Sequence, residues 1–173
     1  MRKVLVVVDM QNDFIIGSLG TKEAENIVDI VVKKINEYDK ENIYATRDTH
    51  TEDYLNTSEG RHLPVIHCVR NTKGWELDKK IEEALSNVVV VDKTTFGSVE
   101  LAEMLKSENN KEAIEIELVG LCTDICVVSN ALLFKAYMPE VNISVDSKCC
   151  AGVTVDSHNA ALETMRMCQI EVK

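Results

Sequence analysis

One stretch sets the frame for the rest of the chain: Leu118-Val119-Gly120-Leu121-Cys122-Thr123-Asp124-Ile125-Cys126-Val127. Apolar residues up to Val119 predict a buried strand, Gly120 permits a tight turn, and an apolar pattern with helical spacing follows. Thr123 stands where an N-cap belongs, so we expect a helix from there to about Tyr137. Cys126 would then lie in the first turn of a helix, where unpaired N–H groups and the helix dipole favour a thiolate.

Strands and helices alternate on both sides of this stretch. Strands are expected at residues 3–8, 42–46, 88–91, 114–119, 141–145 and 169–172, and helices at residues 22–40, 75–85, 98–106, 123–137 and 157–167. Residues 51–74 are expected to form a long loop, and residues 108–111 a surface turn. This alternation predicts a single α/β domain with a mostly parallel sheet.

The composition excludes several functional classes. The chain has 173 residues, of which 45% are hydrophobic and 28% charged, as in ordinary soluble domains. Its formal net charge of -10 argues against sequence-independent binding to nucleic acid or to an anionic membrane surface. The apolar runs are too short to span a bilayer, and no signal-peptide pattern precedes the first strand. Six cysteines in a chain of this size favour a reduced, cytoplasmic protein over a disulfide framework.

Four of the predicted strands end at, or are closely followed by, a residue whose side chain could take part in catalysis: Asp9, Asp48, Lys93 and Cys126. Taken singly, Asp9 could cap the next turn, Lys93 could be a solvated lysine and Cys126 a small buried apolar residue. In parallel sheets, however, the carboxyl ends of the strands share one edge, where ligands bind. An acid, a cation and a thiol on that edge are what acyl transfer through sulfur requires.

A second group of polar residues follows the strand at residues 42–46. Asp48, His50 and His67 offer a carboxylate and two imidazoles, which suit a zinc, iron or manganese ion. Glu59 could add a ligand or orient one. From spacing alone a structural role stays open, because Asp-x-His pairs occur by chance and His67 could be a satisfied core residue.

The order and spacing of five motifs carry a resemblance to a known family. The motifs are Val6-Val7-Val8-Asp9-Met10-Gln11-Asn12-Asp13-Phe14; Thr46-Arg47-Asp48-Thr49-His50; Glu59-Gly60 with Leu63-Pro64-Val65-Ile66-His67-Cys68; Lys93-Thr94-Thr95-Phe96-Gly97-Ser98; and Val119-Gly120-Leu121-Cys122-Thr123-Asp124-Ile125-Cys126-Val127. Together they resemble the isochorismatase-like cysteine hydrolases, and within them the nicotinamidases, over nearly the whole chain, so residues 1–173 are expected to form one domain of this kind.

The resemblance implies a three-layer α/β/α fold around a six-stranded, mostly parallel sheet. It implies a catalytic triad of Asp9, Lys93 and Cys126, in which Asp9 takes the thiol proton, Lys93 holds the pair and Cys126 forms an acyl-thioester. It also implies a cis peptide between Leu121 and Cys122, with the N–H groups of Cys122 and Cys126 as the oxyanion hole. Family members are commonly dimers or higher assemblies, so a homo-oligomer is expected.

For the metal and the substrate, the resemblance implies more than the spacing does. Asp48, His50 and His67, with Glu59 as an additional ligand, resemble the site in which nicotinamidases hold zinc, iron or manganese, zinc being the first choice. Phe14 and Phe96 resemble residues that line the pocket for the substrate ring, so the partner is expected to be a small amide.

The chain departs from the family at one place that bears on the substrate. Many nicotinamidases have Trp-Pro before the His-Cys pair, whereas this chain has Leu63-Pro64. The leading hypothesis is hydrolysis of nicotinamide, and the alternative is an amidase for another small amide or a carbamoyl or ureido compound. An isochorismatase-type reaction is disfavoured because it does not need the cysteine.

Two alternative functions do not involve amide hydrolysis. A thiol redox protein using Cys122 and Cys126 would need neither Asp9 nor Lys93. A binding or scaffold protein without activity is disfavoured by the complete triad. Cys149 and Cys150 follow a predicted strand near the same edge and are assigned to packing.

Overall fold

The computed structural model describes residues 1–173 and contains one six-stranded sheet in which every neighbouring pair is parallel, in the order β3-β2-β1-β4-β5-β6. The strands are β1 (Arg2–Val8), β2 (Ile43–Asp48), β3 (Val89–Lys93), β4 (Ile114–Leu121), β5 (Ile143–Ala151) and β6 (Glu171–Val172). The helices are α1 (Asn12–Ile15), α2 (Lys22–Ile35), α3 (Ser58–His62), α4 (Lys79–Ala84), α5 (Val99–Lys111), α6 (Val128–Tyr137) and α7 (Val155–Met167). The prediction of an α/β fold with a parallel sheet is confirmed.

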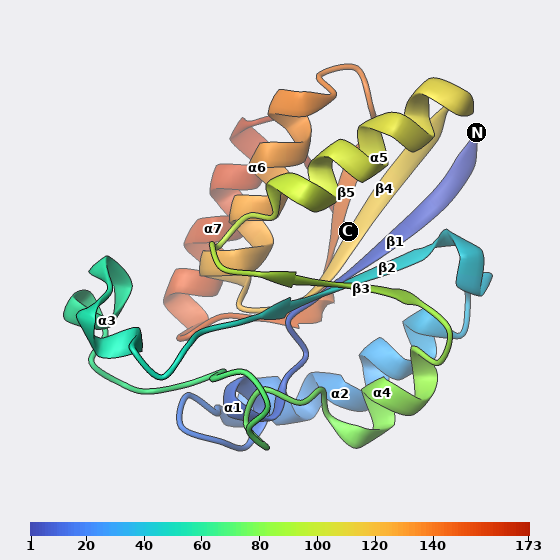
Figure 1. Cartoon of the computed structure of the whole chain (residues 1–173). Helices are drawn as coiled ribbons and strands as arrows, with labels where there is room; N and C mark the ends of the chain where they lie inside the picture. Colours follow the sequence, from blue (N-terminus) through green and yellow to red (C-terminus); the bar gives the residue numbers. More distant parts are fainter.

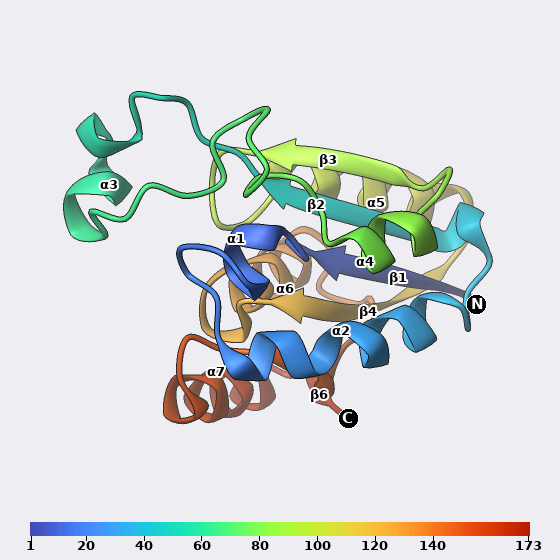
Figure 2. The ribbon, with the colours of Figure 1, turned by 90° about the horizontal axis from the view of Figure 1, so that it is seen from below.

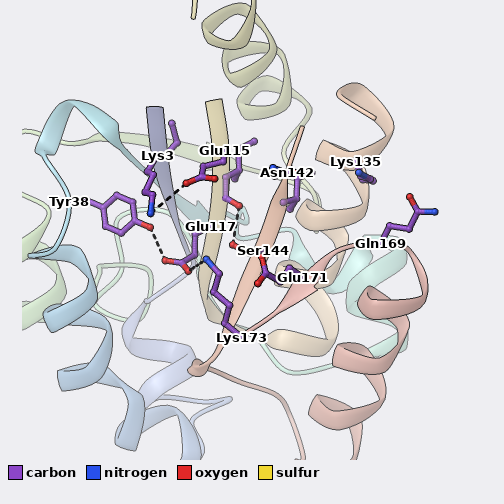
Figure 3. A pocket seen from close by; sticks show the side chains of 13 residues that line it. Lys3, Tyr38, Glu115, Glu117, Lys135, Asn142, Ser144, Gln169, Glu171 and Lys173 are labelled. Carbon is purple, nitrogen blue, oxygen red and sulfur yellow. Dashed lines mark hydrogen bonds and ion pairs between the residues drawn. The ribbon is translucent and has the colours of Figure 1, made fainter. Parts of the chain in front are cut away.

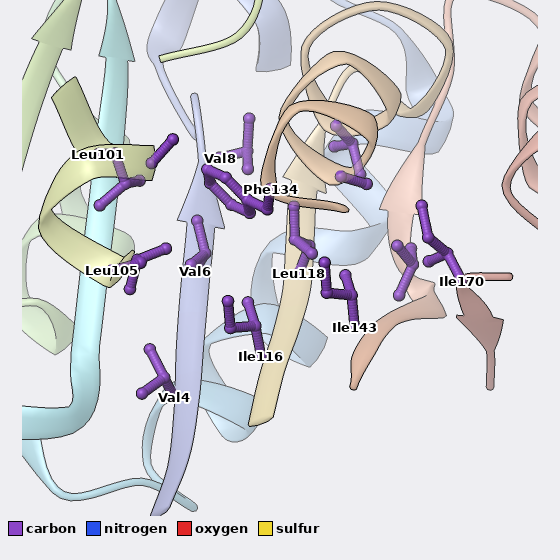
Figure 4. Close-up of a cluster of buried hydrophobic side chains, with 14 of the residues drawn as sticks. Val4, Val6, Val8, Leu101, Leu105, Ile116, Leu118, Phe134, Ile143 and Ile170 are labelled. Carbon is purple, nitrogen blue, oxygen red and sulfur yellow. The ribbon is translucent and has the colours of Figure 1, made fainter. Parts of the chain in front are cut away.

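Helices cover both faces of the sheet, which makes three layers. One face packs against α1, α2 and α4 and the other against α5, α6 and α7 (Figure 1). Alternate residues of β1 supply the two cores: Val4, Val6 and Val8 face α5 and α6 (Figure 4), while Leu5 and Val7 face α2. A strand buried on both faces explains why this segment is apolar throughout. None of the helices is long and apolar enough to cross a membrane.

The register of the central strands brings their carboxyl ends to one edge of the sheet. Val8 pairs with both Thr46 and Gly120, and Asp48 pairs with Lys93. Gly120 adopts a φ of 118°, and a Cβ there would come within 2.1 Å of the Val8 carbonyl oxygen. Only glycine permits this close approach of β4 to β1. The turn that follows β4 therefore starts directly beside the end of β1.

Two helix boundaries on the α2 side differ from the prediction. The helix expected at residues 22–40 ends at Ile35, because Tyr38 leaves the helix direction and its hydroxyl donates to Glu117 Oε2 at 2.8 Å. The helix expected at residues 75–85 begins at Lys79, where Asp78 caps it. The residues just before it instead contact the chain after β1, through a bridge between Gln11 and Leu77.

On the other face, two elements are longer than predicted. The expected surface turn at residues 108–111 is the last turn of α5, in which Glu108 forms a 2.7 Å ion pair with Arg2. β5 continues to Ala151 instead of ending at Val145, past a register shift against β4 between Leu118 and Gly120. The residues expected to follow the strand are therefore part of it, and Cys149 and Cys150 are buried there.

The segment predicted as one long loop contains a 3₁₀ turn (Tyr54–Asn56) and α3, which Thr57 caps through the Gly60 N–H. This segment, which we call the α3 arm (residues 51–66), extends away from the body of the fold at the carboxyl edge of the sheet (Figure 1 and Figure 2). Tyr54 anchors its base, because its buried ring packs 4.6 Å from the His50 ring and its hydroxyl donates to the Leu63 carbonyl oxygen.

Candidate active site

Three buried side chains meet at the carboxyl edge of the sheet. Asp9 follows β1, Lys93 ends β3 and Cys126 lies in the turn after β4, and none is more than 4% exposed. Lys93 Nζ lies 2.7 Å from Asp9 Oδ2 and 3.3 Å from Cys126 Sγ. The structure therefore brings together the acid, the cation and the thiol that the sequence singles out.

The simpler explanations of these residues do not fit their surroundings. Asp9 caps no helix, because α1 is preceded by Gln11 and has no side-chain cap. Instead, Asp9 Oδ1 accepts a 2.6 Å hydrogen bond from the Thr46 hydroxyl while Oδ2 faces Lys93. Lys93 is buried and so is not a solvated surface lysine. Each residue is held toward the other two.

Burial governs the protonation of this group. It raises the pKa of the Asp9 carboxyl and of the Cys126 thiol, against the opposing charge of Lys93. Burial would lower the pKa of Lys93, but Asp9, Cys126 and Asp48 raise it overall, so it stays an ammonium. One cation beside two acids favours a single shared negative charge, and the carboxyl is the stronger acid. Burial therefore favours the thiol form of Cys126, against the effect expected from the helix position alone.

The turn that carries Cys126 differs in detail from the predicted helix start. It is a π-helical turn (Thr123–Val127) leading into α6, and its N-cap residue is Cys122, without a side-chain cap. Thr123 is not the cap: its buried hydroxyl forms a 2.8 Å hydrogen bond with Nδ1 of His158 on α7. Burial lowers the pKa of His158, which favours a neutral imidazole there. The Leu121–Cys122 peptide is cis, as the resemblance implies.

Asp48, His50, Glu59 and His67 form a second cluster beside the triad. One ligand atom from each lies within 4.8 Å of all the others. Asp48 Oδ2 is 2.9 Å from His50 Nε2 and 3.5 Å from His67 Nε2, and Glu59 Oε1 is 3.7 Å from both imidazoles. Burial would raise the pKa of Asp48, but the close contacts with His50 and His67 and the charge of Lys93 hold it below its usual range. All four ligands named from the sequence are together.

Backbone pairing sets the two imidazoles side by side. The His50 N–H donates to the Cys68 carbonyl oxygen and the Arg70 N–H to the His50 carbonyl oxygen, so the chain after His67 runs along the end of β2. His67 Nδ1 bonds the Val65 carbonyl oxygen at 2.8 Å, which leaves Nε2 directed at Asp48 and Glu59. His50 Nε2 is buried and has no hydrogen-bond partner. Nitrogen and oxygen donors with such an atom among them fit a divalent transition-metal ion.

The two clusters share a contact. Asp48 Oδ1 lies 3.4 Å from Lys93 Nζ, while Asp48 Oδ2 faces the histidines. Lys93 thus contacts Asp9, Cys126 and Asp48, one from each of three other segments at the edge. A charge change in either cluster acts on the other through this ammonium.

Two polar residues that hold the site were not singled out from the sequence. Gln11 is fully buried; its Oε1 accepts the Asp48 N–H at 2.7 Å and its Nε2 donates to the Asp48 carbonyl oxygen at 2.8 Å. Asp13 Oδ2 accepts the Cys68 N–H at 2.7 Å, next to His67. Both belong to the motif that begins with Asp9, so the signal was present, but side-chain bonds to a distant backbone leave no periodic pattern.

A cavity of about 660 Å³ opens onto both clusters. Cys122, Cys126, Asp48 and His67 form part of its wall. Apolar side chains form much of the rest: Phe14, Leu19, Leu63, Phe96, Ile125 and Val153. An apolar cavity with a few convergent polar groups is the usual form of a small-molecule site. Phe14 and Phe96, expected near the substrate ring, both line it.

Comparisons with known proteins agree with this architecture. The family model described as "Isochorismatase domain" matches residues 3–172. The nicotinamidase of Schizosaccharomyces pombe is 26% identical over 203 residues, which cover 97% of this chain and 91% of that protein.

Two solved structures superpose over nearly the whole chain. The pyrazinamidase of Pyrococcus horikoshii in complex with zinc is 26% identical, with a TM-score of 0.80 and coverage of 100% of this chain and 99% of that one. The nicotinamidase/pyrazinamidase of Bacillus subtilis is 26% identical, with a TM-score of 0.81 and coverage of 99% of both chains. Nicotinamidases hydrolyse amides, and the matching family is hydrolytic. This chain therefore belongs to the isochorismatase family and is a hydrolase of that family.

Proposed function

We propose that the protein is a metal-dependent cysteine amidohydrolase that converts nicotinamide and water to nicotinate and ammonia. The observation that carries this proposal is that two clusters open onto one cavity and share a lysine: Lys93 Nζ contacts Asp9 and Cys126 on one side and Asp48 on the other. Relatives named nicotinamidase and pyrazinamidase, at about 26% identity, support the same choice.

Protons move between Asp9 and Cys126 in the proposed cycle. Asp9 accepts the thiol proton, the thiolate attacks the amide carbon, and the carbonyl oxygen becomes an oxyanion. Asp9 then returns the proton to the amide nitrogen, ammonia leaves, and an acyl-thioester remains on Cys126. Water attacks the thioester, Asp9 takes a proton from it, and nicotinate departs as the thiol is restored. Lys93 stays charged throughout and lowers the cost of the thiolate beside the carboxyl group.

The oxyanion needs donors that are fixed before the reaction begins. We propose the backbone N–H groups of Cys122 and Cys126, both of which border the cavity. Loss of one such donor typically lowers kcat by about two to three orders of magnitude. A backbone donor cannot be removed by changing a side chain, so its contribution is tested through the residues that hold the turn.

Asp48, His50, Glu59 and His67 would hold the metal ion, zinc being the first choice. A bound divalent ion would supply a Lewis acid for the ring nitrogen of the substrate. Phe14 would support the ring from the body of the fold, since its own ring lies 5.6 Å from that of His67. Phe96 would cover it from the β3–α5 loop. The amide then faces the thiol because the ring is held at its opposite side.

A second candidate is an amidase for a different small amide. The observation in its favour is the cavity wall, where Leu63 stands near the position at which many nicotinamidases have tryptophan. The single tryptophan, Trp75, lies elsewhere: its indole N–H donates to the Thr49 hydroxyl and its ring stacks on Arg47 at 3.8 Å. Because leucine is smaller than tryptophan, this part of the wall leaves room for more than one kind of acyl group.

Ammonia release from a panel of small amides tests both candidates. The panel contains nicotinamide, pyrazinamide, benzamide and a carbamoyl compound, each assayed with the zinc-, iron- and manganese-loaded protein. The proposal expects the highest kcat/KM with nicotinamide and a large loss with benzamide, which lacks the ring nitrogen. No turnover of nicotinamide beside rapid hydrolysis of another amide would overturn the substrate and favour the second candidate.

A further inference from the structure

Asn130 is a fully buried polar residue in the first turn of α6 and reaches across to the β3–α5 loop. Its Nδ2 donates to the carbonyl oxygen of Cys126 at 2.8 Å and to that of Phe96 at 3.2 Å. Its Oδ1 accepts the N–H of Ser98 at 2.9 Å. One side-chain amide therefore joins two segments that are more than thirty residues apart in sequence.

These two segments carry two of the three triad residues. Lys93 ends β3, and the loop that follows leads through Phe96 to Ser98, the N-cap of α5. Cys126 lies one helical turn before Asn130. The 3.3 Å contact from Lys93 Nζ to Cys126 Sγ therefore spans the same gap that Asn130 bridges. The segments also pack tightly there, since a Cβ on Gly97 would lie 3.2 Å from the Ser129 carbonyl oxygen.

We propose that Asn130 is a positioning residue that fixes the distance between the Lys93 ammonium and the Cys126 thiol. The role rests on the proposed cysteine amidohydrolase function. An amide suits it because a single planar group offers two N–H donors for the two carbonyl oxygens and an acceptor for the N–H. Aspartate has the same shape but lacks both donors, and alanine lacks all three bonds.

A loss of this positioning should change the protonation of the Cys126 thiol. The charged groups that face Cys126 are Asp9, Lys93 and Asp48, and only Lys93 among them favours the thiolate. If the β3–α5 loop drifts from the nucleophile turn, the ammonium moves away and the thiolate loses its counter-charge. A displacement near 1 Å in such a site is enough to lower a rate by about a hundredfold. Asn130 also holds the Phe96 carbonyl oxygen, so the cavity wall would move with the lysine.

The pH dependence of Cys126 alkylation measures this directly. Iodoacetamide is reacted with the metal-loaded protein over a pH series, and Cys126 is followed by peptide mass spectrometry. In Asn130→Asp and Asn130→Ala the pH midpoint should rise by at least half a unit, while the rate at the high-pH plateau reports any change in exposure. In parallel, kcat for nicotinamide should fall at least tenfold and KM should change less than kcat.

A matched variant separates positioning from a general loss of stability. Asn109→Ala removes the 3.1 Å hydrogen bond that the Asn109 side chain accepts from the Ile114 N–H at the amino end of β4, and should destabilise the fold without moving the alkylation midpoint or kcat. Asn130→Ser is the milder substitution if the other two do not fold. Midpoints equal to that of the wild type in folded Asn130 variants would overturn the proposal, as would the failure of all three to fold. Should the wild type release no ammonia from nicotinamide, the proposed substrate is wrong, while the thiol midpoint still decides the role of Asn130.

Discussion

Buried carboxylates lie beside lysine in two parts of the sheet: Glu117 in the amino half of β4, which we call the amino end, and Asp9 and Asp48 beside Lys93 at the carboxyl end. The two parts differ in how those charges are used. At the amino end, Glu117 of β4 accepts hydrogen bonds from the Tyr38 hydroxyl and from Lys173 Nζ, both at 2.8 Å (Figure 3). Glu117 also lies 3.4 Å from Lys34 Nζ. Lys34 in turn pairs with Asp146 at 2.8 Å. Every charge in this cluster has a partner, and the adjoining cavity of about 260 Å³ is lined mainly by polar groups.

At the carboxyl end, two buried atoms have a charged neighbour within 2.9 Å but no aligned hydrogen bond. Asp9 Oδ2 and His50 Nε2 have no well-aligned hydrogen bond. The third such atom in the protein, Arg2 Nε, belongs to a guanidinium that already bonds Glu108. Buried polar groups are normally hydrogen-bonded, so buried atoms without an aligned bond, in contact with residues that line the cavity or with the triad lysine, indicate a place for a ligand or a reacting group. The fully paired Glu117 cluster therefore supports the fold, whereas Asp9 Oδ2 and His50 Nε2, without aligned hydrogen bonds, lie where we propose the reaction to take place.

The largest effect at the carboxyl end is expected when the Cys126 thiol is removed. Cys126→Ala should abolish ammonia release from the proposed amide substrate, by about four orders of magnitude or more, because no other group there can form the acyl intermediate. The assay is ammonia production under saturating substrate. Cys168→Ala, at an exposed cysteine directly after the C-terminus of α7, is the control and should retain full activity. Substantial turnover by Cys126→Ala would show that the reaction does not pass through this sulfur.

Lysines from the two ends can be compared directly. Lys93→Met leaves Asp9 and Asp48 buried without their cation, so kcat should fall about a hundredfold or more and the free energy of unfolding should drop by about 3–5 kcal/mol. Lys173→Met removes one partner of Glu117 near the surface and should cost about 1 kcal/mol or less, with kcat unchanged. Steady-state kinetics and urea unfolding measure both. Equal losses of activity in the two variants would contradict the proposal that only the carboxyl end of the sheet takes part in the reaction.

Metal removal should affect binding more than chemistry. Dialysis against a chelator removes the proposed ligand of the substrate ring, so KM should rise about tenfold, equivalent to about 1.4 kcal/mol of binding, with a smaller change in kcat. Restoring zinc should restore KM. An unchanged KM in demonstrably metal-free protein would assign the Asp48 cluster a structural role, like that of Glu117.

The sequence predicts the carboxyl edge of the sheet better than the rest of the fold, and the reason is physical. Buried strands give continuous apolar runs, so the ends of β1, β3 and β4, and with them Asp9, Lys93 and Cys126, are visible in the sequence. Helix ends depend on tertiary partners instead. Tyr38 leaves its helix to bond Glu117, which comes from a strand far along the chain.

The same argument explains what the sequence hides near the nucleophile. Thr123 has the identity of an N-cap, but its hydroxyl bonds His158 on α7 because that helix packs against the turn. Asn130 falls within a helical pattern and carries no local sign of its three tertiary hydrogen bonds. Local propensity predicts elements, whereas positioning contacts arise only once distant elements are packed.

The smallest expected effect tests the amino end alone. Burial would raise the pKa of Glu117, but Lys173, Tyr38 and Lys34 hold it below its usual value. Because the folded pKa is the lower one, the stabilisation is present above the unfolded pKa and is lost as the pH falls through the folded pKa. Urea unfolding from pH 6 down to pH 3 should therefore show a steeper loss of stability in the wild type than in Glu117→Gln, by on the order of 1 kcal/mol after solvent screening. At neutral pH the variant should retain its kcat, since neither Glu117 nor its partners Tyr38, Lys34 and Lys173 line the catalytic cavity. Identical pH profiles of stability would mean that this cluster, although fully paired, contributes no pH-dependent stability to the fold.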